Sequence, residues 1–216
     1  HSMITPVTVL YDPESEKSIP GQRYDAKEPS SSGYVWKKYC DWSDHAMIQI
    51  LDGGVDVIYF RYADVLLMHA EALLETKGVA ASSEIFAIIN QLRDRCGGGR
   101  VTEANYTSED ALRTLVRNER RVELANEGLR FFDIRRWKVA EKTVAVSGEG
   151  MNGEVYGAFM RLDGVGATDR TVTVDGVPRR YVETYNFDPS KHYLFPVPSK
   201  EIDLTNGALT QNSGWD

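Results

Sequence analysis

The carboxylates of greatest chemical interest are Glu119 and Glu123, which stand one helical turn apart in a segment rich in arginine. A glycoside hydrolase uses two acids, but they must face each other across a cleft. Here both acids share one predicted helix, and Glu119 falls on its apolar face. A core-facing carboxylate is costly unless it is paired and hydrogen-bonded. We therefore expect an internal ion network with arginines of neighbouring helices: Arg93, Arg120 or Arg136.

Three aromatic residues ahead of the predicted helices are the candidate binding residues. Sugar rings present apolar C–H faces ringed by hydroxyl groups, so a sugar-binding surface needs flat aromatic side chains with polar groups beside them. Tyr34, Trp36 and Trp42 meet this requirement. The charged residues among them are Lys37, Lys38 and Asp41. Core packing is the alternative for each aromatic residue, but a carbohydrate site within this fragment is predicted here.

The remaining reactive side chains predict no metal, cofactor or catalytic site. Asp41, Asp44 and His45 are close in sequence, but two acids and a histidine in a loop are common by chance, and we expect no metal there. No serine or cysteine with a nucleophile signature accompanies His69, which we expect to be a core or interhelical hydrogen-bonding residue. The glycine-rich residues 147–153 lack the strand and the lysine of a phosphate loop. We therefore expect that the protein is not an enzyme.

The two cysteines, Cys40 and Cys96, allow one disulfide at most. Cys96 continues the apolar stripe of residues 85–92, which favours a buried thiol. The sequence leaves open whether the two cysteines pair, and no CxxC motif suggests zinc.

Residues 59–137 contain the helices that must position these side chains. Within residues 61–77, one stripe recurs at steps of three and four, which is typical of a helix. That stripe comprises Tyr62, Leu66, His69, Ala70 and Leu73. A second stripe covers residues 85–96, and a glycine follows each of the two. Because only a few residues around 79–82 join them, we expect antiparallel neighbouring helices.

A third helix is predicted to begin near residue 107, where Thr107 can cap the free amide groups and Glu109 and Asp110 suit the positive helix end. Its stripe comprises Leu112, Leu115, Val116, Glu119, Val122 and Glu123. We expect about four helices in antiparallel pairs within residues 59–140.

Outside the helices the sequence predicts extended or irregular structure. Residues 171–181 alternate around Asp175-Gly176, a pair typical of a type I′ hairpin. Residues 193–198 contain two prolines and cannot be helical. Residues 211–215 supply polar caps and a tryptophan that ties down the chain end. We interpret residues 147–190 as a decorating insertion on the helical body. It holds a second set of aromatic residues for a ligand surface: Tyr156, Phe159, Tyr181, Tyr185 and Phe187.

The bulk composition excludes some partners. The 216 residues carry a formal net charge of -7, whereas a phosphate backbone favours clustered Lys and Arg, so we expect no nucleic-acid partner. No run approaches the roughly 18 apolar residues of a transmembrane helix. We predict a mainly α fold in a single domain spanning residues 1–216, with residues 1–3 resembling a vector-derived scar.

Five segments, in this order along the chain, are similar to the C-terminal motifs of the SusD/RagB family: residues 59–73, 89–95, 118–137, 193–198 and 211–214. The resemblance extends over residues 33–216. It implies a SusD-like helical body of antiparallel helix pairs with long irregular segments and a small β-hairpin. It also implies non-catalytic binding of an oligosaccharide or polysaccharide at the cell surface, for uptake through a SusC-like TonB-dependent transporter.

Members of this family usually begin with a lipoprotein signal, a lipid-bearing cysteine and a helical half with tetratricopeptide-like pairs. The resemblance is therefore to their C-terminal part. It implies a place on the extracellular face of the outer membrane, with membrane contact only through a lipid anchor absent from this chain. Two other functions stay open, a tetratricopeptide-like protein-interaction scaffold and a glycoside hydrolase that uses Glu119 or Glu123. Burial separates them, because a hydrolase needs those acids exposed in a cleft.

Overall fold

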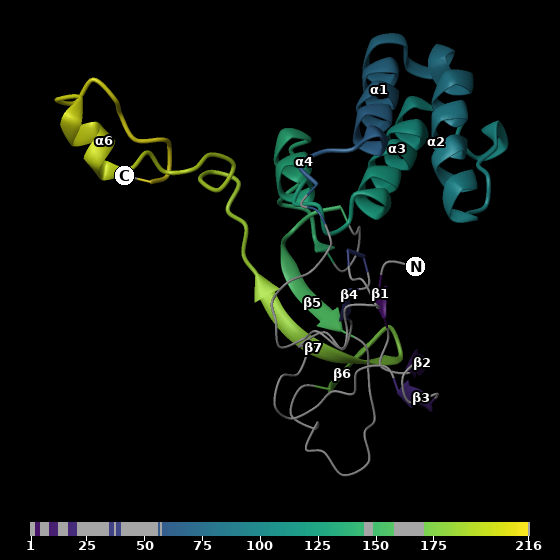
Figure 1. Cartoon of the computed structure of the whole chain (residues 1–216). Helices are drawn as coiled ribbons and strands as arrows, with labels where there is room; N and C mark the ends of the chain where they lie inside the picture. The colour runs from purple at the N-terminus through teal and green to yellow at the C-terminus, as the bar shows by residue number, and fades with distance from the viewer. Residues whose placement is uncertain are drawn as a thin grey trace. The chain divides into compact units, whose positions relative to one another are not determined.

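The computed structural model describes residues 3–4, 9–12, 17–20, 35–36, 38–39, 56, 58–144, 149–157 and 171–215, and for the strands before residue 38 it describes the backbone alone. The chain divides into two compact units, whose elements are labelled in Figure 1. One unit comprises residues 39–130. The other comprises residues 1–38 together with residues 131–216.

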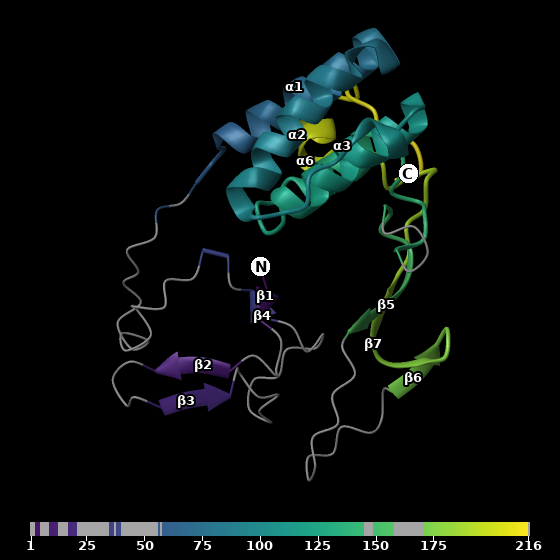
Figure 2. The same ribbon diagram turned by 90° about the vertical axis from the view of Figure 1, so that its right-hand side faces the viewer.

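The unit of residues 39–130 is helical. Its long helices are α1 (Tyr62–Lys77), α2 (Ser82–Cys96) and α3 (Glu109–Glu123), and the short 3₁₀ helices are η2 (Gly78–Ala81) and η3 (Glu103–Asn105). Figure 2 shows α1, α2 and α3 side by side. Because η2 turns the chain within one short 3₁₀ helix, α2 runs back along α1, as the sequence predicts.

The helix ends follow local chemistry, with one difference from the prediction. The left-handed Gly97 (φ 69°) ends α2, a conformation that glycine adopts without strain. The side chain of Ser108, not that of Thr107, caps α3, and its Oγ accepts a hydrogen bond from the amide of Ala111 at 3.2 Å. The predicted cap is thus one residue early, because α3 begins at Glu109 and the N-cap is the residue directly before the first helical one.

Two apolar clusters form the core of this unit. The first joins the second half of α1 to α2 and α3, and consists of Ala70, Leu73, Leu74, Ala81, Ile85, Phe86, Ile89, Val101, Leu112, Leu115 and Val116. The second lies under the first half of α1, and consists of Ala63, Leu66, Leu67, Leu92 and Leu124. Most of these residues come from the three predicted stripes, so the helix-forming pattern also sets the core.

The predicted stripe of α1 is rotated from the observed one. Tyr62 is 67% exposed and His69 is exposed too. The core alternative for His69 is therefore wrong, and its role in an interhelical hydrogen bond stays a prediction. The stripe is rotated because α1 contacts both α2 and α3. Its buried arc is therefore wide and centres on residues such as Leu67 and Leu74, which a narrow stripe through Tyr62 and His69 misses.

The ends of two stripes also lie on the surface. Cys96, predicted to be buried, is exposed, because the buried residues of α2 end at Leu92, one turn earlier. Its thiol donates to the carbonyl oxygen of Arg93 at 3.3 Å. Val122, near the end of α3, is 63% exposed.

The other unit contains the described strands. β1 (Met3–Ile4) pairs with β4 (Val35–Trp36), and β2 (Val9–Asp12) pairs with β3 (Lys17–Pro20), both antiparallel. A three-stranded antiparallel sheet follows in the order β5-β7-β6, built from β5 (Gly153–Gly157), β6 (Thr171–Val174) and β7 (Val177–Tyr185).

The predicted hairpin forms the β6-β7 half of this sheet. Val174 pairs with Val177, so the turn contains only Asp175 and Gly176. Both have positive φ angles, 51° and 76°, as a type I′ turn requires. The sequence prediction is confirmed, and β5 adds a third strand to it.

Two helices and a clamped C-terminal segment complete this unit. The helices are α4 (Arg130–Arg136) and α6 (Ser199–Leu204), and α4 contributes Ile134 to a small cluster with Val139, Ala140 and Phe187. Residues 193–198 are non-helical, as predicted. The side-chain amide of Gln211 donates to the carbonyl of Val197 at 2.9 Å and accepts from its amide at 2.7 Å. Trp215 Nε1 donates to the carbonyl of Leu194 at 3.0 Å, which agrees with a structural tryptophan.

The mainly α prediction is confirmed, since helices dominate the described residues. Among those residues, no helix is both long enough and apolar enough to cross a membrane. The single domain of residues 1–216 and the insertion of residues 147–190 stay predictions.

Candidate functional site

The acid of chief interest, Glu119, is buried and held by an arginine. Its Oε2 accepts hydrogen bonds from Arg93 Nη2 at 2.8 Å and from Arg93 Nε at 3.0 Å. Arg93 also donates to the carbonyl of Gly99 at 3.0 Å. The predicted pairing with Arg93 is confirmed. Two charge-assisted N–H···O bonds from one guanidinium converge on the same oxygen and hold this carboxylate as a structural partner.

Glu123 belongs to a second group of ion pairs, centred on Arg61 just before α1. Arg61 Nη1 and Arg95 Nη2 both lie 2.5 Å from Glu123 Oε1, and Arg61 Nη2 lies 2.6 Å from Glu127 Oε1. Burial opposes the charged form of Arg61, but the hydrogen bonds to Glu127 and Glu123 raise its pKa above the ordinary value. These contacts tie the start of α1 to the end of α3.

The other two arginines of the predicted set pair with aspartates. Arg120 Nη1 lies 2.9 Å from Asp64 Oδ1, and both side chains are buried between α3 and α1. Arg136 Nη2 lies 2.8 Å from Asp133 Oδ1 on its own helix α4. An internal ion network therefore exists, but it is larger than predicted and includes Asp64.

The predicted carbohydrate-binding residues are not tested by the structure. Tyr34 and Trp42 lie outside the described residues. The backbone of Trp36 lies in β4, where it pairs with Met3, but its side chain is outside the description. Asp41, Asp44 and His45 lie outside it as well. Among the described residues, no group of three His, Cys, Asp or Glu is arranged to hold a metal ion.

A tyrosine pair on the three-stranded sheet is brought together by a β-bulge. Val155 pairs with Glu183, but the next residue of β5, Tyr156, pairs with Tyr181, so β7 has one extra residue there. A bulge changes the alternation of side chains along its strand. As a result, Tyr181 lies on the sheet face of Tyr156, and Tyr185 lies on the opposite face.

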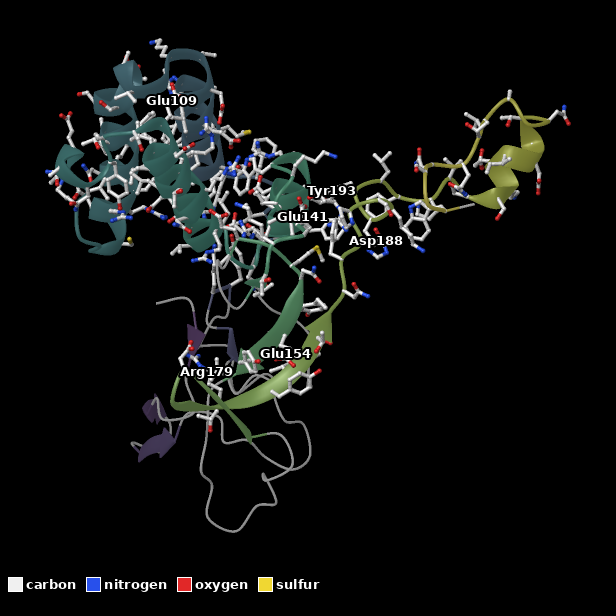
Figure 3. The ribbon with its side chains drawn as sticks, turned by 180° about the vertical axis from the view of Figure 1, so that it is seen from behind. Glu109, Glu141, Glu154, Arg179, Asp188 and Tyr193 are labelled. Atoms are coloured by element: carbon white, nitrogen blue, oxygen red, sulfur yellow. The ribbon has the colours of Figure 1, made fainter. Side chains whose placement is uncertain are left out.

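Polar side chains flank this pair on the same face. The hydroxyl of Tyr156 hydrogen-bonds to the carboxylate of Glu154, and the hydroxyl of Tyr181 lies 2.9 Å from Thr184 Oγ1. The hydrogen bond to Glu154 raises the pKa of Tyr156, so its phenol stays protonated. Arg179, two residues before Tyr181 on β7, is exposed. Figure 3 shows Glu154 and Arg179 on the sheet.

The sequence alone counted Tyr156 and Tyr181 among several aromatic residues of the insertion but did not bring them together. The hairpin signal indicated β6 and β7, whereas no local pattern indicated that β5 pairs with β7 or where the bulge lies. Once β5 is paired with β7, the register itself identifies Tyr156 and Tyr181 as a cross-strand aromatic pair.

A second aromatic group surrounds Arg135 of α4. Its guanidinium carbon lies 3.4 Å from the ring centroid of Phe131, 5.6 Å from that of Phe187 and 5.8 Å from that of Phe195. Burial lowers the pKa of Arg135, and its Nε has no hydrogen-bond partner among the described residues. Aromatic faces here take the place of a carboxylate, and they link α4 to the proline-containing segment.

Comparison with known proteins places this geometry in a family. The sequence profile of the SusD family matches residues 16–215. The chain belongs to the SusD family. Among curated relatives, SusD-like protein P2 of Formosa agariphila is 30% identical over 169 residues, which cover 76% of this chain and 27% of that protein. SusD-like protein P38 of the same organism is 34% identical over 99 residues, covering 43% of this chain and 18% of that one.

Solved SusD-family structures share the fold. A SusD-like protein of Bacteroides fragilis superposes with a TM-score of 0.72 at 26% identity, over 99% of this chain and 38% of the other. A SusD-like carbohydrate-binding protein of the same species gives a TM-score of 0.64 at 25% identity, over 94% of this chain and 39% of the other. This SusD-family chain thus spans well under half the length of the relatives it matches.

Proposed function

We propose that this SusD-family protein binds a glycan at the cell surface without making or breaking a bond, and passes it to a SusC-like TonB-dependent transporter of the outer membrane. The observation that carries the proposal is the family match over residues 16–215, supported by the similarity to a SusD-like carbohydrate-binding protein. A lipid anchor in the full-length protein would hold it on the extracellular face.

The geometry of the two acids supports binding rather than hydrolysis. Glu119 is buried, and both its hydrogen bonds with Arg93 use the same carboxylate oxygen. Glu123 is held by Arg61 and Arg95. A general acid or nucleophile must reach a glycosidic bond with a free oxygen in a cleft. Carboxylates held by guanidinium groups fit a structural role better.

Tyr34, Trp36 and Trp42 remain the proposed glycan contacts ahead of α1. Their aromatic surface suits the apolar faces of sugar rings, and Lys37, Lys38 and Asp41 supply partners for hydroxyl groups. Segments that connect regular elements commonly carry binding residues.

Glycan-array screening of the full-length protein tests the binding proposal. We expect retention of at least one oligosaccharide or polysaccharide with no release of shorter products. Trp36→Ala and Trp42→Ala, measured on the best ligand with the melting temperature monitored, then test the proposed contacts. An array without any retained glycan, or products that shorten with time, would contradict the proposed function.

The uptake role needs a separate measurement. We expect a TonB-dependent transporter to co-purify with the tagged full-length protein from solubilised outer membranes. Mass spectrometry of the purified complex identifies the partner, and its absence under conditions that preserve other membrane complexes would contradict this part of the proposal.

A further inference from the structure

We propose that the β5-β7 face carrying Tyr156 and Tyr181 is a stacking platform for a neutral glycan. This inference rests on the proposed glycan binding and adds a location and a ligand class to it. The platform is defined by four residues of that face: Glu154, Tyr156, Tyr181 and Thr184.

The strand register places two aromatic side chains on the same face of the sheet. Tyr156 and Tyr181 are directly paired across β5 and β7, and paired residues of an antiparallel sheet have Cβ atoms about 5 Å apart on one face. Both side chains are only half-buried, so ring surface remains open to solvent. Two partly exposed tyrosines on one sheet face offer apolar ring surface on which a sugar can stack.

The hydroxyl groups hold these rings in place before a ligand arrives. Tyr156 bonds to Glu154 on the same strand, and Tyr181 bonds to Thr184 across the bulge. Each tyrosine therefore has little rotational freedom left to lose when a ligand binds, which favours affinity. The bulge is essential to this arrangement, because a regular strand would place Tyr181 and Thr184 on opposite faces.

The polar groups beside the rings match sugar hydroxyl groups and define the ligand class. Glu154 uses one carboxylate oxygen for Tyr156, and its other oxygen has no partner among the described residues. Arg179 follows on the same face, where it is exposed and makes no described contact. An acceptor and a donor suit hydroxyl groups, and their opposite charges leave no excess positive charge to favour a uronate or sulfate.

A purely structural role makes a different prediction. If the tyrosine pair only supports the sheet, replacing it lowers the melting temperature and leaves glycan affinity unchanged. Tyr185 provides the matched control. It lies on the same strand but on the opposite face and is 41% exposed, and interaction with a glutamate, Glu183, raises the pKa of its phenol as Glu154 does for Tyr156.

Affinity electrophoresis of the full-length protein tests the inference. The probes are starch, xylan and galactomannan as neutral polysaccharides, with alginate and heparin as anionic ones. We expect the wild type to be retarded by a neutral polysaccharide, and Tyr156→Ala and Tyr181→Ala each to weaken that retardation by about tenfold, in line with the loss of one aromatic contact. Tyr185→Ala should bind as the wild type does.

Nitration of tyrosines in the wild-type protein tests the platform without any variant, so the result does not depend on whether the alanine variants fold. The retarding polysaccharide should protect Tyr156 and Tyr181, but not Tyr185, from tetranitromethane, as read by peptide mass spectrometry. Retardation by neutral polysaccharide with no change in the two variants and no protection overturns the platform alone. A preference for alginate or heparin overturns the neutral class, and retardation by none of the probes together with an empty glycan array overturns the proposed function itself.

Discussion

At the scale of single residues, the acids that first suggested catalysis serve to join helices. Glu119 on α3 accepts both of its described hydrogen bonds from Arg93 on α2, and Asp64 on α1 meets Arg120 on α3. Removing one member of such a pair leaves a partly buried charge without its partner. That cost usually exceeds the value of the intact pair, because desolvation is no longer offset.

Replacing Glu119 with alanine should therefore destabilise the fold by about 3 kcal/mol, since Arg93 loses its carboxylate partner. Urea unfolding of the wild type and Glu119→Ala measures this difference. Glu84→Ala is the control, because the Glu84-Lys77 pair is exposed and 3.6 Å apart. Its effect should stay within about 0.5 kcal/mol. Equal stability of Glu119→Ala and wild type would show that the network is dispensable.

A pH dependence is expected from the pair of Glu75 and Arg113. Hydrogen bonding from Arg113 lowers the pKa of Glu75 below its ordinary value of 4.5. Because the folded-state pKa is the lower one, the pair adds stability above that ordinary value, and the gain is lost as the pH falls through the folded pKa. Glu75→Gln should thus lower the melting temperature slightly near pH 7, because an exposed ion pair contributes at most about 1 kcal/mol. At about pH 2 the variant and the wild type should melt at the same temperature. A constant gap between the two melting curves at both pH values would contradict this assignment.

At the scale of elements, the start of α3 distinguishes two neighbouring hydroxyl residues. Ser108 caps the helix through Ala111, whereas Thr107 stands one residue outside it. Ser108→Ala should cost about 1 kcal/mol, the usual value of an N-cap, and Thr107→Ala should cost much less. Denaturant unfolding of the two variants decides between the positions, and the reverse order would restore Thr107 as the cap.

At the scale of the whole molecule, the helical unit contains its own core. Both apolar clusters of α1, α2 and α3 lie within residues 63–124, with Ile88, Tyr106 and Leu129 packed against them. The ion pairs of Arg61, Arg93 and Arg120 with their described acids also close within residues 61–127. A unit with its own core and satisfied charges is expected to fold alone.

Residues 56–130 expressed alone should therefore be helical and should unfold in one cooperative transition. Circular dichroism followed through a thermal melt checks this. The same fragment carrying Leu67→Ala, which empties a fully buried site, is the control for cooperativity and should melt several degrees lower. A broad, featureless melt of the unmodified fragment would mean that residues outside it complete the core.

The sequence by itself determined the features that depend on neighbours along the chain. Helical spacing of apolar residues indicated α1, α2 and α3, and glycines marked the ends of α1 and α2. Asp175-Gly176 specified a type I′ turn. Each of these features depends on local backbone geometry. The motifs of residues 59–73, 89–95 and 118–137 also indicated the family, which the profile match confirms. A carboxylate on an apolar stripe was enough to predict that Glu119 is paired.

Only the tertiary structure decided the features that depend on which elements meet. The width of the buried arc of α1 follows from its contacts with both α2 and α3, and His69 lies outside that arc, on the surface. Arg120 pairs with Asp64, which lies 56 positions away in the sequence, and no local pattern predicts this pairing. The pairing of β5 with β7 set a bulge that brought Tyr181 to the face of Tyr156. Contacts between distant segments are fixed by packing of the whole unit, and no periodicity within one segment encodes them.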